Sequence, residues 1–328
     1  MRAMVLDSFG GPDVLHLADI ACPFASPGNV VIQVAYAGVN PADWKSREGW
    51  LAAYFQYQFP FVVGFDATGV IVQIGAGVSG FSIGDRVVTA SNQGLGERGT
   101  YAEFVRSAAE RVARLPDNVS LQDAATLPTA GMTAWEATID VGKATAGSIV
   151  VVNGGAGGTG SFAVQIAMRA GATVIATCSA GNFDYVRSLG ADHAVDYRAG
   201  DVYAAIRALA PDGVDLVVDT VGQGSFIGAL SIMKRGGIIA PIGTLIADEA
   251  TIDPAAAQDA GVTIVPTMSN FVNQPRQLRG LVAGLANGSL RAPETVVMPL
   301  AEAGEAHRRI QSGHVRGKIL LEVAAGRA

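Results

Sequence analysis

The stretch SIVVVNGGAGGTG, residues 148–160, places a run of β-branched residues directly before a glycine-rich turn. Gly155, Gly157 and Gly160 in this turn have the spacing G-x-G-x-x-G. Residues 161–177 carry apolar side chains first at helical spacing and then as a second strand-like run. This order of strand, turn, helix and strand predicts a βαβ unit, the context that this glycine spacing needs if it is to bind a dinucleotide.

The glycines have a physical role in such a turn. Glycine allows backbone torsions that other residues resist, and it lets a pyrophosphate approach the main chain. The helix that follows offers unpaired N–H groups and a positive partial charge to that anion. The alternative is a tight turn without a ligand. We expect the pyrophosphate to be held by six consecutive residues: Gly155, Ala156, Gly157, Gly158, Thr159 and Gly160.

The end of the second strand favours NADP over NAD. An NAD site usually has an acidic residue there, whose carboxylate binds the ribose 2′-hydroxyl. Here Ser179 follows the strand, and the first acidic residue, Asp184, lies further into the next helix. A hydroxyl group tolerates a 2′-phosphate that a carboxylate would repel. No Lys or Arg stands close by in the sequence to neutralise the phosphate.

Composition limits the classes of function. The chain has 328 residues, of which 49% are hydrophobic, enough for two domains with cores of their own. Its net charge of -6 argues against nonspecific binding to nucleic acid or to an anionic membrane. The chain turns polar too early for a signal peptide, and no apolar run is long enough to span a bilayer, so we expect a cytoplasmic protein. Cys22 and Cys178 are too few for a disulfide framework or a Cys-rich zinc site.

Two patterns divide the chain. Up to about residue 114, short strand-like runs alternate with Gly and Ser turns, which suggests a small barrel. After about residue 123, apolar strands alternate with helical patterns, which predicts a doubly wound parallel sheet. The tail returns to a mixed pattern, with strands expected at 295–300 and 318–323.

Seven motifs, in this order, resemble the medium-chain dehydrogenase/reductase superfamily, and within it the zinc-independent quinone oxidoreductases of the zeta-crystallin-like branch. They are AGVNPAD at 37–43, VGFDATGV at 63–70, GTYAE at 99–103, LPTAGMTAW at 127–135, the glycine-rich turn, VDTVG at 218–222 and HVRGK at 314–318. The resemblance covers essentially the whole chain.

This resemblance implies an α/β fold. A GroES-like β-barrel catalytic domain would span 1–122 and be completed by 270–328, and a Rossmann NADP-binding domain would span 123–269. The active site would lie in the cleft between them. A homodimer is expected through edge strands of the two Rossmann sheets, with residues 262–268 as that edge.

The resemblance also implies that zinc is absent. In the alcohol-dehydrogenase branch, the first Cys ligand would stand near Asn40, and a His would follow Gly64, where this chain has Phe65. Phe cannot bind zinc, and residues 88–99 contain no Cys for a structural zinc site. Without a Lewis acid, the expected chemistry is hydride donation to an acceptor that is already electrophilic, a quinone or an α,β-unsaturated carbonyl.

Further cofactor residues follow from the same resemblance. Ser179 and Tyr197 match positions that hold the 2′-phosphate, with Asn182 in place of a Lys that relatives often carry. The alternative is that Ser179 caps a helix and Tyr197 packs in a strand. Thr129 matches a nicotinamide contact or begins an ordinary helix. Other contacts are expected at strand ends, above the nicotinamide and from the tail: Val221, Ile242, Gly243, Thr244, Phe271 and Lys318.

Three residues are candidates for catalysis. Asn40 and Asp43 replace the zinc-binding loop and are expected to orient the nicotinamide or the substrate, although Asn40-Pro41 also suits a plain turn. Tyr54 belongs to an aromatic stretch, residues 44–61, that would line a pocket for a flat acceptor or pack as a core, and it is a candidate proton donor.

The leading hypothesis is an NADPH-dependent quinone or enone reductase. An enoyl-thioester reductase is the alternative enzyme, and it would need a long channel and a dedicated tyrosine acid. A non-catalytic, crystallin-like protein that binds NADPH or RNA is the alternative from another class. The acidic net charge and the intact glycine-rich turn argue against it.

Overall fold

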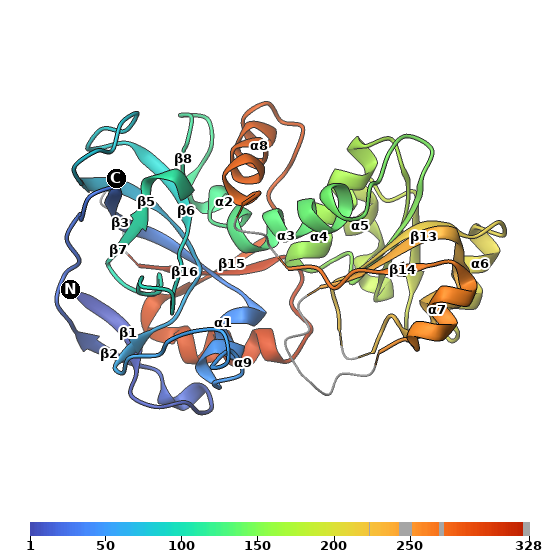
Figure 1. Cartoon of the computed structure of the whole chain (residues 1–328), viewed down its shortest axis with the longest axis horizontal. Helices are drawn as coiled ribbons and strands as arrows, with labels where there is room; N and C mark the ends of the chain where they lie inside the picture. Colours follow the sequence, from blue (N-terminus) through green and yellow to red (C-terminus); the bar gives the residue numbers. More distant parts are fainter. Residues whose placement is uncertain (223, 243–250, 269–271, 324–328) are drawn as a thin grey trace. The chain divides into compact units, whose positions relative to one another are not determined.

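The computed structural model describes residues 1–222, 224–242, 251–268 and 272–323. The chain forms two compact units, Met1–Thr129 with Phe271–Ala328, and Ala130–Asn270. Figure 1 shows the elements of both units. The predicted domain boundaries lay at 122–123 and 269–270, and the compact units divide after Thr129 and Asn270. Among the described residues, no helix has the length and apolar character to cross a membrane.

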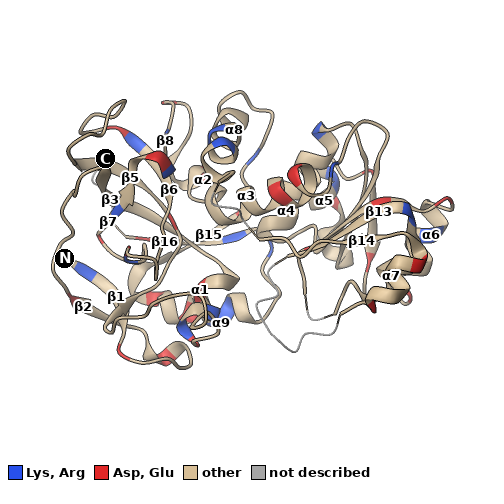
Figure 2. Cartoon of the chain, viewed as in Figure 1, with Lys and Arg blue, Asp and Glu red and all other residues tan. Residues whose placement is uncertain are grey.

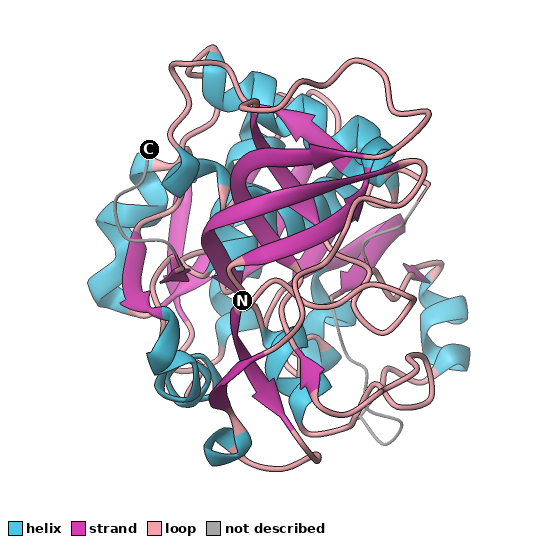
Figure 3. Cartoon of the chain, turned by 90° about the vertical axis from the view of Figure 1, so that its left-hand side faces the viewer, coloured by secondary structure: helices cyan, strands magenta, loops and turns pink. Residues whose placement is uncertain are grey.

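The first unit is rich in strands, as Figure 3 shows. Its larger sheet has seven strands in the order β15-β16-β3-β5-β6-β8, with β7 also paired to β3. The strands are β3 (Asn29–Val39), β5 (Asp66–Ile74), β6 (Arg86–Ala90), β7 (Phe104–Ala108), β8 (Val112–Arg114), β15 (Thr295–Pro299) and β16 (Lys318–Glu322). The long β3 holds this sheet together, because β16, β5 and β7 all pair with it antiparallel.

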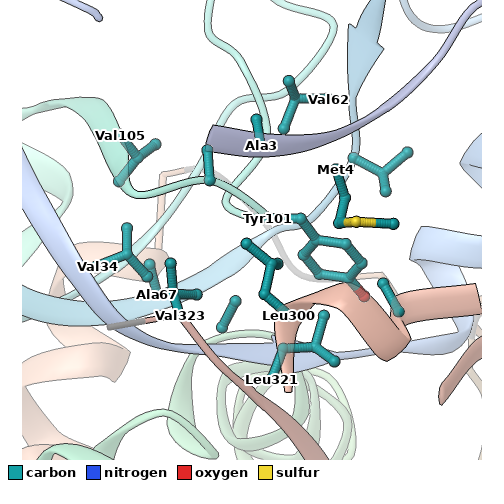
Figure 4. Packing of buried hydrophobic residues seen from close by; sticks show 14 of the residues in the cluster. Ala3, Met4, Val34, Val62, Ala67, Tyr101, Val105, Leu300, Leu321 and Val323 are labelled. Carbon is teal, nitrogen blue, oxygen red and sulfur yellow. The ribbon is translucent and has the colours of Figure 1, made fainter. Parts of the chain in front are cut away.

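A smaller sheet in this unit has the order β2-β1-β4. It consists of β1 (Arg2–Leu6), β2 (His16–Asp19) and β4 (Phe61–Val62). The core combines apolar side chains from both sheets and from the C-terminal segment, as Figure 4 shows for Ala3, Val34 and Leu321. Complete burial of such Val and Leu side chains stabilises the fold by roughly 1.5–3 kcal/mol each. The C-terminal segment is therefore part of this core.

Helices of the first unit lie in both of its chain segments. They are α1 (Pro41–Arg47), α2 (Leu121–Ala124), α8 (Gln274–Ala286) and α9 (Ala303–Gln311). The helix α1 begins after Asn40, whose backbone N–H donates to Asp43 Oδ2 at 2.7 Å. This contact satisfies a donor at the helix N-terminus and holds the Asp43 carboxylate there.

The second unit contains a six-stranded parallel sheet in the order β11-β10-β9-β12-β13-β14. The strands are β9 (Ile149–Asn153), β10 (Thr173–Cys178), β11 (His193–Asp196), β12 (Val214–Asp219), β13 (Met233–Pro241) and β14 (Thr263–Ile264). The predicted doubly wound parallel sheet is confirmed. The strand order reverses between β9 and β12, and α/β sheets bind ligands at the carboxyl ends of such a pair.

The helices of this unit are α3 (Met132–Trp135), α4 (Gly158–Arg169), α5 (Phe183–Ser188), α6 (Val202–Leu209) and α7 (Pro254–Ala260). Single π-helical stretches, Leu127–Gly131 and Glu136–Asp140, precede and follow α3 along the chain. The chain also has 3₁₀ helices at Pro12–Val14, Ala109–Arg111, Ala180–Asn182, Ile227–Ile232 and Leu300–Glu302. Figure 2 shows acidic and basic residues interspersed over the chain in that view.

Candidate active site

The glycine-rich turn connects β9 to α4 through three differently constrained glycines. Gly154 has φ +73°, a torsion that favours glycine. A Cβ at Gly155 would lie 2.8 Å from Ala176 Cβ, and one at Gly160 would lie 2.1 Å from the Gly154 carbonyl oxygen. The turn and the first residues of α4 therefore pack too closely for any larger residue at these two positions.

Gly157 differs from its neighbours. A Cβ there would have one contact within 4 Å, with Gly154 O at 3.5 Å, so no described residue needs glycine at this position. Gly157 precedes α4, whose first-turn N–H groups have no partner within the helix. This geometry fits a pyrophosphate. Gly157 has no side chain to cover the main chain, and the positive N-terminal end of the 12-residue helix α4 follows directly.

On the side of β10 away from β9, the carboxyl ends of the parallel strands β10 and β11 lie next to each other. Cys178 pairs with Asp196, so Ser179 and Tyr197 follow at the same edge of the sheet. Asn182 Nδ2 donates to Ser179 Oγ at 3.1 Å, which brings two of the predicted phosphate residues together. Tyr197 is half exposed.

Arg198 was not among the site residues expected from the sequence. Its guanidinium lies over the Tyr197 ring, 5.2 Å from the centroid, and its Nε donates to the Tyr197 hydroxyl at 3.2 Å. No Lys or Arg stands close to Ser179 in the sequence, but the pairing of β10 with β11 brings Arg198, two residues after the end of β11, to the same sheet edge. The one feature of the sequence that pointed to Arg198 was its position directly after Tyr197.

A buried polar network joins β9 and β12, the two strands between which the strand order reverses. Asn153 of β9 donates to Asp219 Oδ1 of β12 at 3.0 Å, and Ser225 Oγ donates to the same oxygen at 2.6 Å. Val221, just beyond β12, is 57% exposed, and the Ile242 N–H donates to Asp219 O at 2.8 Å. The predicted contacts Gly243, Thr244 and Phe271 lie outside the described residues.

A second polar cluster lies buried in the first unit, around Asp66 at the start of β5. Asp66 Oδ1 accepts from the backbone N–H and the hydroxyl of Thr129, at 3.0 and 2.5 Å. Asp66 Oδ2 accepts from Asn40 Nδ2 at 3.0 Å and lies 3.2 Å from Lys318 Nζ. Lys318 Nζ also donates to Asn40 Oδ1 at 2.5 Å. Three predicted residues, Asn40, Thr129 and Lys318, therefore meet at Asp66.

Asp43 adds a second carboxylate to this cluster. Its side chain is fully buried. Burial, and to a lesser extent the negative charge of Asp66, raise its pKa to about 7, although the Asn40 N–H and the charge of Lys318 act to lower it. Two carboxylates thus share one buried ammonium, an arrangement that holds a proton near neutral pH.

Asp66 is a residue that sequence reasoning quoted in a motif without giving it a role. It directly follows Phe65, and its carboxylate fits beside β3 only because Gly38 has no side chain. A Cβ at Gly38 would lie 2.8 Å from Asp66 Oδ2. A glycine and a carboxylate on paired strands were the available signal.

Tyr54 does not join this cluster through any hydrogen bond of the described residues, and its side chain is 63% exposed. The neighbouring aromatic rings pack against one another. Trp44 and Trp50 have centroids 4.8 Å apart, and Phe55 lies 6.1 Å from Phe65. Across the described ranges, no group of three His, Cys, Asp or Glu side chains is arranged to hold a metal ion.

A glycine-rich turn on a doubly wound parallel sheet, together with a separate strand-rich unit that carries a buried carboxylate cluster, is typical of two-domain dehydrogenases and reductases. Family models match accordingly. The alcohol dehydrogenase GroES-like domain matches residues 26–117, and the zinc-binding dehydrogenase model matches residues 189–321.

Individual proteins match over nearly the full chain. A probable quinone oxidoreductase of Leishmania amazonensis is 31% identical, covering 90% of this chain and 89% of its own. A solved NAD-dependent alcohol dehydrogenase superposes with a TM-score of 0.90 at 31% identity, covering 99% and 100% of the two chains. A mycobacterial protein solved in complex with NADPH has a TM-score of 0.88 at 30% identity, covering 98% and 100%.

The chain belongs to the medium-chain dehydrogenase/reductase superfamily, in its quinone-oxidoreductase-like branch. The predicted family and the predicted GroES-like and Rossmann fold are thereby confirmed. This membership identifies the chain as an oxidoreductase that uses a nicotinamide cofactor.

Proposed function

We propose that the chain is a zinc-independent, NADPH-dependent reductase that transfers hydride to a quinone or an α,β-unsaturated carbonyl. The observation that carries the proposal is the turn at Gly157, bare of side chains and backed by the N-terminus of α4. When bound, NADPH would supply the hydride, which carries both electrons of the reduction. One relative is named a probable quinone oxidoreductase, which points to the same class of acceptor.

The preference for NADPH is supported by the sheet edge after β10 and β11. Ser179 and Asn182 present a hydroxyl and an amide there, and Tyr197 carries the Arg198 guanidinium on its ring. An arginine binds a phosphate with charge-assisted hydrogen bonds. β10 ends at Cys178 and not at a carboxylate, and the acidic residue at this edge, Asp196 of β11, accepts from the Arg198 backbone N–H at 2.9 Å.

The choice of acceptor is supported by the cluster around Asp66. Phe65 stands where the zinc-dependent branch has a histidine, and a phenyl ring donates no lone pair to a metal. Lys318 provides a cation from the chain itself, bound to Asn40 and Asp66. We propose that Thr129 and Asn40 orient the nicotinamide or the acceptor, and that solvent supplies the proton that completes the reduction.

Quenching of NADPH fluorescence tests the proposal first. Saturable binding is expected, tighter for NADPH than for NADH. NADPH oxidation is then followed with a quinone, an alkenal and an enoyl-CoA. Turnover of the quinone or the alkenal supports the proposal, whereas turnover of enoyl-CoA alone would identify a thioester reductase. The absence of saturable binding of both NADPH and NADH would rule out a reductase.

We also propose a homodimer formed through β14, the last strand in the sheet order of the second unit. Its residues, Thr263 and Ile264, are exposed and partly exposed. An edge strand leaves main-chain groups available for a second copy. Analytical ultracentrifugation should give twice the chain mass. Ile264→Pro removes an N–H that faces away from β13 and should shift the protein towards the monomer.

A further inference from the structure

Four buried side chains form one continuous line of hydrogen bonds in the first unit. Arg47 Nη1 lies 3.1 Å from His307 Nδ1, and His307 Nε2 lies 3.1 Å from the Tyr101 hydroxyl. That hydroxyl donates to Asp43 Oδ2 at 3.0 Å. All four residues have zero exposure, and Figure 4 shows the Tyr101 ring among apolar side chains of the core. Water therefore does not compete with these contacts.

The chemistry of its first member gives this line a direction. Arginine can only donate, so His307 Nδ1 accepts and the neutral ring carries its proton on Nε2. Nε2–H then donates to the Tyr101 oxygen, which leaves the Tyr101 proton for Asp43. Burial, and to a lesser extent the charge of Arg47, lower the pKa of His307 to about 3, so the ring stays neutral. Every donor thus points towards Asp43.

Asp43 receives this line at one oxygen only. Oδ2 accepts from Tyr101 and from the Asn40 N–H, while Oδ1 has no hydrogen-bond partner among the described residues. The other charges near Asp43 are Asp66 from β5 and Lys318 from β16. Asp43, Asp66 and Lys318 together carry one net negative charge when all three are ionised, and none when Asp43 holds a proton.

We propose that Tyr101 and His307 are positioning residues that set the charge of the Asp43–Asp66–Lys318 cluster, and that this charge controls the rate of hydride donation. This inference rests on the proposed function, in which Asn40 and Thr129 contact the reacting groups. Loss of hydride leaves a positive charge on the nicotinamide. An anionic cluster stabilises that developing charge, and a neutral cluster does not. The rate should therefore rise as Asp43 loses its proton.

Infrared spectroscopy of the cofactor-free protein measures this charge directly. The carbonyl band of a protonated carboxylic acid should disappear with a midpoint near pH 7, and it should be missing in Asp43→Asn. Tyr101→Phe removes a donor that stabilises the carboxylate, so the midpoint should move upward by about one pH unit. Tyr57→Phe is the matched control, because the Tyr57 hydroxyl lies 2.9 Å from Ser46 Oγ, and Ser46 belongs to α1, the helix that carries Asp43. Its midpoint should not move.

The pH dependence of kcat for NADPH oxidation completes the test. Its rising limb should follow the infrared midpoint in the wild type and move with it in Tyr101→Phe. His307→Gln keeps the Tyr101 hydroxyl and should move both by a smaller amount, which provides a second variant if Tyr101→Phe does not fold. A limb that stays in place while the midpoint moves overturns the inference. An intact infrared titration without any NADPH oxidation would overturn the proposed function instead.

Discussion

The Tyr101 hydroxyl and His307 Nε2 lie 3.1 Å apart, although 206 positions of the chain separate them. Tyr101 follows the early strands of the first unit, and His307 lies in α9 near the C-terminus. Inside an apolar core each of these two polar groups needs a partner in place of water, and each is the other's partner. The two segments therefore depend on each other for their hydrogen bonds. The C-terminal segment is thus joined to the N-terminal strands by polar contacts as well as by packing.

His307 should make the fold sensitive to acid. Its pKa is about 3 in the folded protein, well below the ordinary value of 6.5, so only the unfolded chain takes up a proton between these values. The free energy of unfolding should therefore fall as the pH is lowered through this window, by up to about 1.4 kcal/mol per pH unit. Urea unfolding of the wild type and His307→Gln from pH 7 to pH 4 measures the slope, which the variant should reduce.

His193→Gln provides the matched control, because His193 is exposed at the start of β11. This variant should keep the wild-type slope. Equal slopes for wild type and His307→Gln would show that the ring is already charged, or able to become charged, in the folded protein.

Two glycines of the turn should separate stability from cofactor binding. Gly160→Ala places a Cβ 2.1 Å from the Gly154 carbonyl oxygen, and the resulting shift should lower the free energy of unfolding by about 1–3 kcal/mol. Gly157→Ala meets no such contact, and its backbone torsion φ -78° suits alanine. It should keep the wild-type Tm but weaken NADPH binding at least about tenfold, because the methyl group lies where the pyrophosphate approaches.

Thermal unfolding and fluorescence titration of the two variants check this separation. If Gly157→Ala binds NADPH as tightly as the wild type, the pyrophosphate lies elsewhere and the proposed cofactor site is wrong.

Arg198 should determine the preference for NADPH. Loss of a charge-assisted contact to the 2′-phosphate should raise the KM for NADPH about tenfold in Arg198→Gln and leave the KM for NADH unchanged. Arg207→Gln is the control, since the exposed Arg207 side chain binds Ser231. A parallel rise of both KM values in Arg198→Gln would mean that the residue supports the sheet edge and does not read the phosphate.

Local patterns predicted the features whose residues are close in sequence. The β9 run, the glycine spacing and the apolar helix face lie within about twenty positions, so strand, turn and helix could be read directly. The alternating pattern then implied a parallel sheet. Tyr197 and Ser179 could be paired only through the family resemblance, and the guanidinium beside them depends on the register of β10 and β11.

The buried cluster required tertiary information. Asp66 and Lys318 are far apart in sequence, and each is a charged residue that a pattern assigns to the surface. Only the pairing of β16, β3 and β5 brings the two charges together. Tyr54 was considered because of its aromatic neighbours, and composition alone could not distinguish an exposed ring from a buried Tyr101.

The Lys318–Asp66 pair should show how strongly these buried charges depend on each other. Lys318→Met leaves two buried carboxylates without their ammonium and should cost about 3–5 kcal/mol of unfolding free energy. Asp66→Asn in the same chain removes one of those charges, so the double variant should be more stable than Lys318→Met alone. Lys234→Met is the control, because its pair with Asp215 at 2.8 Å is partly exposed and should be worth less than about 1 kcal/mol. Urea unfolding of the single and double variants gives the coupling energy, and simple additivity of the two single changes would refute the electrostatic dependence of the pair.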